Sequence, residues 1–261
     1  MADLVNVSRD ARGVATLALA RAEKHNAMSA QMMTELVEAA EALARDPEVR
    51  VVILAAEGPT FCAGGDLAWM REQREMDAAT RKRESRRIAE ALGALARLPQ
   101  PLIGRIHGNA FGGGVGLISV CDAAIGVVGA KLGLTEVRLG LLPANIGPYV
   151  VAKMGAAKAR EIFMNGRIFP AEEGVRLNLL KDVVAPEALD AAVEAEVAPY
   201  LTCAPGAVAE AKALLAALAG RVSEADVDMA IDALADRWET AEAEEGLTAF
   251  FDKRKPRWAG G

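Results

Sequence analysis

Two glycine-rich stretches decide how this 261-residue chain is interpreted: Phe61-Cys62-Ala63-Gly64-Gly65-Asp66 and His107-Gly108-Asn109-Ala110-Phe111-Gly112-Gly113-Gly114. Each follows a β-branched apolar run, at residues 49–56 and 101–107, which predicts a strand buried on both faces. Strand, glycine loop and helix then recur along the chain. This order predicts an α/β protein, built on a largely parallel sheet or a spiral of ββα turns, with its ligand at the glycine loops.

Neither stretch matches a phosphate-binding loop. A Walker sequence needs Gly-Lys-Ser/Thr after its glycines, and a dinucleotide fingerprint needs its glycines in the first strand-to-helix turn. Glycine here instead lets backbone amides approach a ligand without side chains in the way. Because Gly112–Gly114 open a predicted helix, an amide there suits a carbonyl oxygen that gains negative charge. One such loop alone would be read as a tight turn, but the pair predicts an oxyanion hole.

The composition is that of a globular protein with a large core, at 52% hydrophobic and 25% charged residues. A formal net charge of −6 argues against a general nucleic-acid binder. The first ten residues lack the order of a signal peptide, and no apolar run reaches the roughly 20 residues of a membrane span. Three widely spaced cysteines fit a reducing compartment. We therefore expect a cytoplasmic protein without nucleic-acid or membrane partners.

The chain divides into a mixed core and a helical tail. Ser29 is placed to cap a helix that Asp46-Pro47 ends, and the β-prone residues 3–7 and 13–19 predict a hairpin before it. Ala-rich segments in the tail predict helices at 187–200, 206–219 and 223–243. Their apolar positions include Leu214, Leu215, Leu218, Met229, Ile231 and Leu234. We expect this tail to pack on the core or on a neighbouring subunit.

The two glycine loops resemble sequence motifs of the enoyl-CoA hydratase/isomerase (crotonase) superfamily. So does the segment that follows them, Thr135-Glu136-Val137-Arg138-Leu139-Gly140-Leu141-Leu142-Pro143. The resemblance runs from Arg21–Met28, similar to the family's coenzyme A segment, to Glu245–Pro256, similar to its terminal helix. It implies a spiral core at residues 1–195, for thioester binding and catalysis, and a helical trimerisation region at 196–261. The implied assembly is a homotrimer or a dimer of trimers. Coenzyme A would be part of the substrate, with no metal or other cofactor.

The resemblance also implies roles for single residues. The amides of Gly65 and Gly113 would hold the thioester carbonyl, and Glu136 would be the catalytic carboxylate. Contacts with coenzyme A or substrate are implied for Lys24, His25, Ala63, Asp66, Leu67, Gly112, Phe250 and Lys253. Lys253 and Arg254 are candidates for phosphate contacts, because Ala68 stands where some relatives have a lysine.

One departure from the family pattern leaves the reaction open. Hydratases of the family carry a second glutamate where this chain has Gly116. Hydration needs a base and an acid, whereas a Δ3-Δ2-enoyl-CoA isomerase needs one base, and a non-catalytic coenzyme A-binding protein needs neither. The strings FCAGGDLAWM and FGGGVGL nevertheless look most like bacterial methylglutaconyl-CoA and isohexenylglutaconyl-CoA hydratases. Hydration of an α,β-unsaturated CoA thioester, with a branched glutaconyl-type acyl group as one candidate, is therefore the main hypothesis.

Other reactive side chains are assigned lesser roles. Cys62 is interpreted as a buried filler and His107 as a packing or backbone-bonding residue, because neither has an activating partner in sequence. Arg71, Arg105 and Arg138 are each candidates to meet a substrate carboxylate. A substrate carboxylate or another polar side chain could take the missing glutamate's role. Gly116→Glu would place a carboxylate opposite Glu136, provided that the pocket has room.

Overall fold

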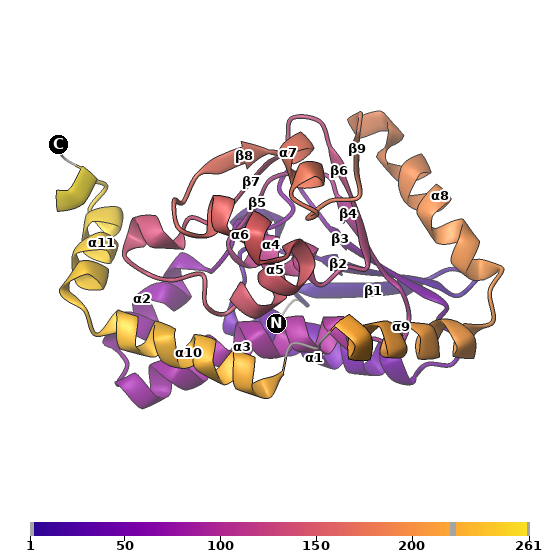
Figure 1. Cartoon of the computed structure of the whole chain (residues 1–261), viewed down its shortest axis with the longest axis horizontal. Helices are drawn as coiled ribbons and strands as arrows, with labels where there is room; N and C mark the ends of the chain where they lie inside the picture. The colour runs from indigo at the N-terminus through magenta and orange to yellow at the C-terminus, as the bar shows by residue number, and fades with distance from the viewer. Residues whose placement is uncertain (1–2, 220–222, 260–261) are drawn as a thin grey trace.

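The computed structural model describes residues 3–219 and 223–259, and a six-stranded sheet forms its centre (Figure 1). The strand order is β1-β2-β3-β4-β6-β9, with only the β1–β2 hairpin antiparallel. These strands are β1 (Val5–Arg9), β2 (Val14–Leu19), β3 (Val51–Ala56), β4 (Leu102–Ile106), β6 (Ala123–Val127) and β9 (Asp182–Val184). A small second sheet joins β5 (Ala110–Phe111), β7 (Lys131–Gly133) and β8 (Ile168–Pro170).

Helices cover the sheet and extend the molecule at its carboxyl end. The α-helices are α1 (Ala30–Arg45), α2 (Leu67–Glu75), α3 (Ala78–Ala96), α4 (Gly113–Ser119), α5 (Gly147–Met154), α6 (Ala156–Phe163), α7 (Ala171–Arg176), α8 (Leu189–Leu201), α9 (Pro205–Ala219), α10 (Glu224–Trp238) and α11 (Ala241–Phe251). Short 3-10 turns are η1 (Ala22–Lys24), η2 (Glu136–Leu139), η3 (Pro186–Ala188) and η4 (Arg257–Ala259). The alternation of strands and helices confirms the predicted α/β class.

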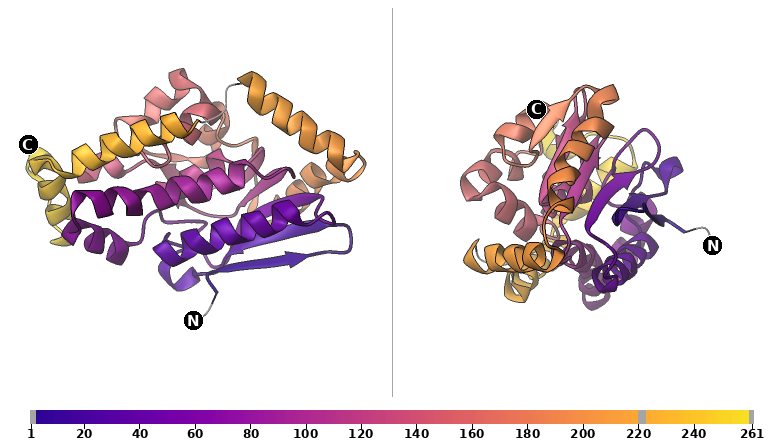
Figure 2. Two further views of the ribbon diagram at one scale, coloured as in Figure 1. Left: turned by 90° about the horizontal axis from the view of Figure 1, so that it is seen from below. Right: turned by 90° about the vertical axis from the view of Figure 1, so that its right-hand side faces the viewer.

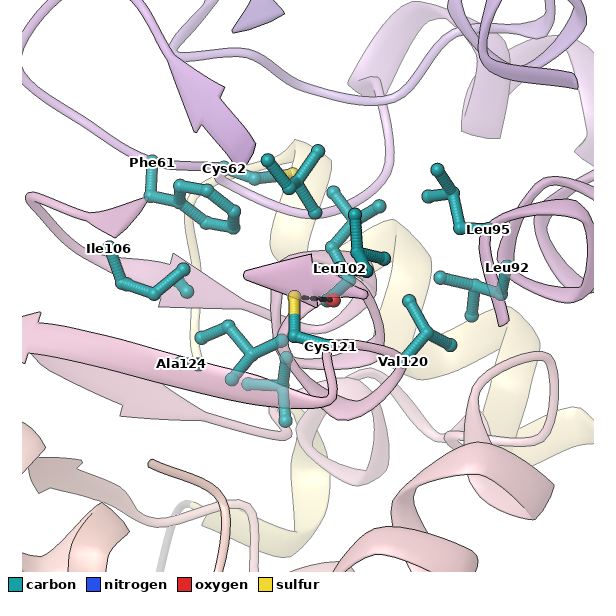
Figure 3. Close-up of a cluster of buried hydrophobic side chains, with 14 of the residues drawn as sticks. Phe61, Cys62, Leu92, Leu95, Leu102, Ile106, Val120, Cys121 and Ala124 are labelled. Atoms are coloured by element: carbon teal, nitrogen blue, oxygen red, sulfur yellow. Dashed lines mark hydrogen bonds between the residues drawn. The ribbon is translucent and has the colours of Figure 1, made fainter. Parts of the chain in front are cut away.

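The core lies where the central strands meet the helices that follow the glycine loops (Figure 3). Phe61 and Leu102 are fully buried there, and the Cys121 thiol donates to the Leu117 carbonyl at 3.3 Å. Close packing of this kind transmits small displacements, because interiors have few voids to absorb them. The strand ends from which the glycine loops extend are therefore held rigidly.

Local signals in the sequence place most element ends correctly. The Ser29 side chain accepts a hydrogen bond from the Met32 amide at the start of α1, as predicted for an N-cap. The single helix predicted at 223–243 is wrong, because the chain breaks between α10 and α11. Thr240 accepts a hydrogen bond from the Ala243 amide and caps the new helix.

The predicted division at residue 195 falls inside α8, which runs unbroken from core to tail. Residues 1–2, 220–222 and 260–261, which that division also includes, lie outside the described residues. Among the described helices, no single one is both long and apolar enough to cross a membrane. Pro186–Leu201 and Pro205–Leu218 pass that test only as a pair bent by 104°.

The carboxyl-terminal helices pack on their own core. In Figure 2 α10 (yellow) runs beside α3 (magenta), and α11 contacts η2. The second contact is close: a Cβ added to Gly246 would lie 2.4 Å from the Leu139 carbonyl oxygen. Ile231 and Leu234 are buried by this docking, so these two apolar positions need no second subunit. The other four apolar positions of the predicted tail, Leu214, Leu215, Leu218 and Met229, are exposed.

Candidate active site

The two glycine loops lie against each other, as their sequences predict. A parallel bridge joins Cys62 to Ala110, in which the Phe111 amide donates to the Cys62 carbonyl at 3.0 Å. A Cβ added to Gly64 would lie 3.1 Å from the Phe111 carbonyl oxygen, at a φ of +96° that favours glycine. Any larger residue at this position would push the loops apart.

Each loop presents one backbone amide without an acceptor. Within the described part of the chain, neither the Gly65 N–H nor the Gly113 N–H donates a hydrogen bond. Gly65 is partly accessible and Gly113 opens α4. Both glycines line the same cavity. Two convergent free donors can hold one oxygen that becomes negative during a reaction.

The segment before α1 holds the first loop in place. The Met28 amide donates to the Gly64 carbonyl at 2.8 Å, and the Asp66 amide donates to the Met28 carbonyl at 3.0 Å. Arg21 Nη1 donates to Asp66 Oδ2 at 2.6 Å. Burial disfavours ionised Asp66, but hydrogen bonds from the Trp69 amide and from Arg21 outweigh it and lower the pKa of this carboxyl. Asp66 thus caps α2 and positions the loop, a role that the resemblance did not indicate.

Glu136 lies beside the second loop, at the first residue of η2. A Cβ on Gly112 would be 3.1 Å from Glu136 Oε1, and the φ of +48° at this residue favours glycine. Glu136 Oε2 is buried and has no partner among the described residues. Burial raises the pKa of Glu136 from its ordinary value of 4.5 to about 7. A carboxyl with this pKa can accept and return a proton near neutral pH.

A cavity of about 470 Å³ extends from the glycine loops. Its lining is mainly apolar and includes Met70, Ile88, Leu139, Leu141, Leu142 and Leu234. Such a lining suits an acyl chain. Among the described residues, no group of three or more His, Cys, Asp or Glu side chains is placed to hold a metal ion.

Three of the residues assigned to substrate contact stand at this cavity as exposed groups: Ala63, Leu67 and Phe250. Lys24, His25 and Lys253 are exposed but do not line it. The His25 ring instead makes a 2.9 Å hydrogen bond, through Nδ1, with the Thr60 hydroxyl. The cavity therefore includes predicted contact residues from the first loop and from α11, while the predicted basic contact residues lie outside it.

The three candidate arginines differ in their partners and in whether they lie at the cavity. Arg105 pairs with Asp190 at 2.7 Å and lies outside the cavity. The Arg71 guanidinium lies 4.5 Å from the centre of the Phe251 ring. Arg138 lines the cavity, is exposed and forms no ion pair with any described residue. Only Arg138 of the three is available to a substrate carboxylate there.

The two reactive side chains near the loops match their predicted roles. Cys62 is fully buried, and burial raises the pKa of its thiol to about 12. His107 Nε2 bonds the Gly58 carbonyl oxygen at 2.8 Å, and burial lowers the pKa of the ring. The Cys62 thiol therefore stays protonated at neutral pH and is not an active nucleophile, and neither side chain lines the cavity described above.

There is no free space where a side chain at position 116 would lie. A Cβ at this position would lie 2.6 Å from Ile146 Cγ2 and 3.0 Å from Leu92 Cδ1. The condition attached to Gly116→Glu, that the pocket has room, is therefore not met. The structure corrects the expectation that this substitution would simply add a working carboxylate.

Sequence reasoning missed four polar residues on the cavity wall: Gln73, Ser85, Asn145 and Trp238. Asn145 Oδ1 is buried and has no hydrogen-bond partner among the described residues. Asn145 precedes Ile146, the residue that fills the space beside Gly116. The only signal in the sequence was a polar residue within an apolar stretch, Leu141–Ile146.

Comparison with known proteins agrees with this geometry. A family model described as enoyl-CoA hydratase/isomerase matches residues 9–261. The chain belongs to this family. The mitochondrial methylglutaconyl-CoA hydratase of Mus musculus is 31% identical over 268 residues, which cover 98% of this chain and 82% of that protein.

Solved structures extend the agreement to the fold. A crystal structure of an enoyl-CoA hydratase from Mycobacterium avium has a TM-score of 0.87 at 31% identity, covering 99% of this chain and 100% of that one. One from Mycobacterium smegmatis has a TM-score of 0.80 at 36% identity, covering 98% and 99%. The predicted crotonase-type fold and enzyme family are confirmed.

We expect Gly116→Glu to destabilise the protein rather than to improve it. Overfilling a packed site costs roughly 1–3 kcal/mol, and the new side chain meets the branched Ile146. Thermal unfolding measures the loss. Gly206→Glu is the matched control, because nothing lies within 4 Å of a Cβ there, and this variant should keep the wild-type Tm. An unchanged Tm in Gly116→Glu with faster hydration would show that our description of this position is wrong.

Proposed function

We propose that this member of the enoyl-CoA hydratase/isomerase family is a hydro-lyase that adds water to an α,β-unsaturated acyl-CoA thioester. The observation that carries the proposal is the placement of Glu136, with its raised pKa, in the cavity that also holds the free Gly65 and Gly113 amides. A thioester oxygen at the two amides would bring its enoyl carbons toward this carboxylate.

The chemistry follows from these groups. Ionised Glu136 takes a proton from water as the water oxygen bonds to Cβ of the enoyl chain. The π electrons move to the thioester oxygen, and the Gly65 and Gly113 amides stabilise the resulting enolate. Protonated Glu136 then returns its proton to Cα. One carboxyl performs both steps in turn, for which a pKa near neutrality is suited.

Asn145 is our candidate for the polar group that complements Glu136. It lines the same cavity, and its carboxamide has no partner among the described residues. An unsatisfied buried oxygen costs about 1–3 kcal/mol, which a bound water would recover. The carboxamide can position that water but cannot supply its proton, so all proton transfer remains with Glu136.

A glutaconyl-type acyl group is the finer part of the proposal. The sequence match to methylglutaconyl-CoA hydratase supports it, as does the unpaired Arg138 at the cavity. The single catalytic glutamate favours a second candidate, a Δ3-Δ2-enoyl-CoA isomerase. A non-catalytic coenzyme A-binding protein is the third, and it makes Glu136 dispensable.

The assembly and setting are also proposals. Leu214, Leu215 and Leu218 are each at least 60% exposed on α9, more apolar surface than one helix normally leaves in water. We propose that they contact another subunit in a trimer or a dimer of trimers. A cytoplasmic location and independence from cofactors remain part of the same proposal.

The deciding experiment supplies the purified protein with straight, branched and glutaconyl 2-enoyl thioesters and with a 3-enoyl thioester. We expect loss of the enoyl chromophore and a 3-hydroxyacyl product from at least one 2-enoyl substrate. Conversion of the 3-enoyl to the 2-enoyl thioester, with no water addition to any substrate, would identify an isomerase instead.

Glu136→Gln should lower kcat for the preferred thioester by at least ~100-fold, as removal of a general acid–base group does. In the wild type, kcat/KM should rise as the pH increases through about 7, because the base must be ionised and Glu136 is protonated below its raised pKa. An ordinary carboxylate would give this rise near pH 4.5. Full turnover by the variant would contradict the mechanism.

Asn145→Ala should lower kcat about tenfold with little change in KM, since the loss of one hydrogen bond would affect the water rather than the thioester. Asn145→Asp should recover part of the rate and add a second ionisation to the pH profile, because two nearby carboxyls raise one pKa. Asn6→Ala on the exposed hairpin is the control. A fall in Tm with kcat unchanged would show that Asn145 is only structural.

A further inference from the structure

The cavity has a second polar region, separate from the glycine loops. Gln73 and Ser85 line it although each is only 3% exposed. Gln73 lies six residues beyond Leu67 on α2, about 9 Å along the helix axis from the first loop. Trp238, at the carboxyl end of α10, lines the same cavity. An acyl chain held at Gly65 would reach these residues with its far end.

Two hydrogen-bond donors in this region are unused. The Ser85 hydroxyl donates to Gln73 Oε1 at 3.2 Å, and no described residue accepts from Gln73 Nε2. Trp238 Nε1 is buried and also lacks an acceptor in the described chain. Trp69, another cavity residue, differs in this respect, because its Nε1 donates to Glu84 at 3.2 Å. An indole N–H can only donate, so the missing partner is an acceptor.

Arg81 contacts both residues that carry these donors, and its own charge is paired. Its Nε donates to the backbone carbonyl of Gln73 at 2.9 Å, and its guanidinium lies 5.3 Å from the centre of the Trp238 ring. Glu239 pairs with the same guanidinium, and the Met76 carbonyl accepts from it at 2.6 Å. The charge of Arg81 is therefore already balanced. A carboxylate brought to Gln73 and Trp238 would lose its hydration, and both unpaired donors there are neutral.

We propose that the acyl chain of the natural substrate carries an uncharged oxygen acceptor, a carbonyl or a hydroxyl, at its far end. Gln73 Nε2 and Trp238 Nε1 would donate to that oxygen. This inference rests on the proposed function only in that the ligand is an acyl-CoA thioester. It competes with the glutaconyl-type acyl group, whose far end is a carboxylate, and the carboxylate-tailed thioester in the test distinguishes the two. A site built to pair a substrate oxygen rejects the analogue that lacks it, because the buried donors then stay unpaired.

The test uses three saturated CoA thioesters of equal chain length that end in a methyl group, a methyl ketone or a carboxylate. Calorimetric Kd values for the wild type should favour the ketone about tenfold over the methyl tail. Trp238→Phe keeps the ring and removes the N–H, and Gln73→Met keeps the shape and removes the amide. Each variant should reduce the ketone-over-methyl ratio at least about fivefold.

Asp236→Asn, an exposed change on α10, should keep the wild-type ratio. Equal affinity for ketone and methyl tails, strongest binding of the carboxylate, or a ratio unchanged in both variants would overturn the inference. A lower Tm with an unchanged ratio likewise means a structural role only. Because saturated thioesters cannot be hydrated, a preference for the ketone without turnover of any 2-enoyl thioester would reject the hydratase proposal and support this inference.

Discussion

The site depends on one steric constraint, the contact between two loops whose backbones have no side chains between them. A Cβ on Gly64 or Gly113 would collide with, or crowd, the opposite loop or Met28. The central strands β3 and β4 pair in parallel, so the chains that leave them emerge at the same edge of the sheet. Neighbouring parallel strands and small residues together place two free amides on the wall of one cavity.

Burial affects both the hydrogen-bond donors and the carboxyl group of the same cavity. Water exclusion strengthens a hydrogen bond to a developing negative charge and also makes a carboxylate hold its proton more tightly. The two effects are complementary in the proposed mechanism, since Glu136 takes a proton from water while the amides receive charge and returns that proton when the charge is lost. Apolar residues from η2, the following loop and α10 supply that exclusion. The hydrophobic lining is thus part of the reaction as well as of acyl-chain binding.

Much of this was accessible from the sequence because it depends on local pattern. β-branched runs mark the buried strands, Ser29 marks a helix start, and the glycine loops with Glu136 mark the reacting end of the cavity. The orientation of Gly116 was not accessible, because it depends on Ile146, thirty residues away. Gln73 and Trp238 were missed for the same reason: α2, α3 and α10 are brought together only by tertiary packing. Long-range contacts form the part of the cavity at Gln73 and Trp238, and local motifs form the part at the glycine loops and Glu136.

The docking of the carboxyl-terminal helices on their own core also affects how the protein matures. Leu234, Trp238 and Phe250, all from the last thirty residues, line the cavity whose floor is formed by residues made much earlier. During synthesis the sheet and both glycine loops emerge well before these helices. The nascent core would therefore expose an open apolar trough until α10 and α11 close over it. Ligand binding and protection from aggregation would thus begin together, once α10 and α11 have been synthesised.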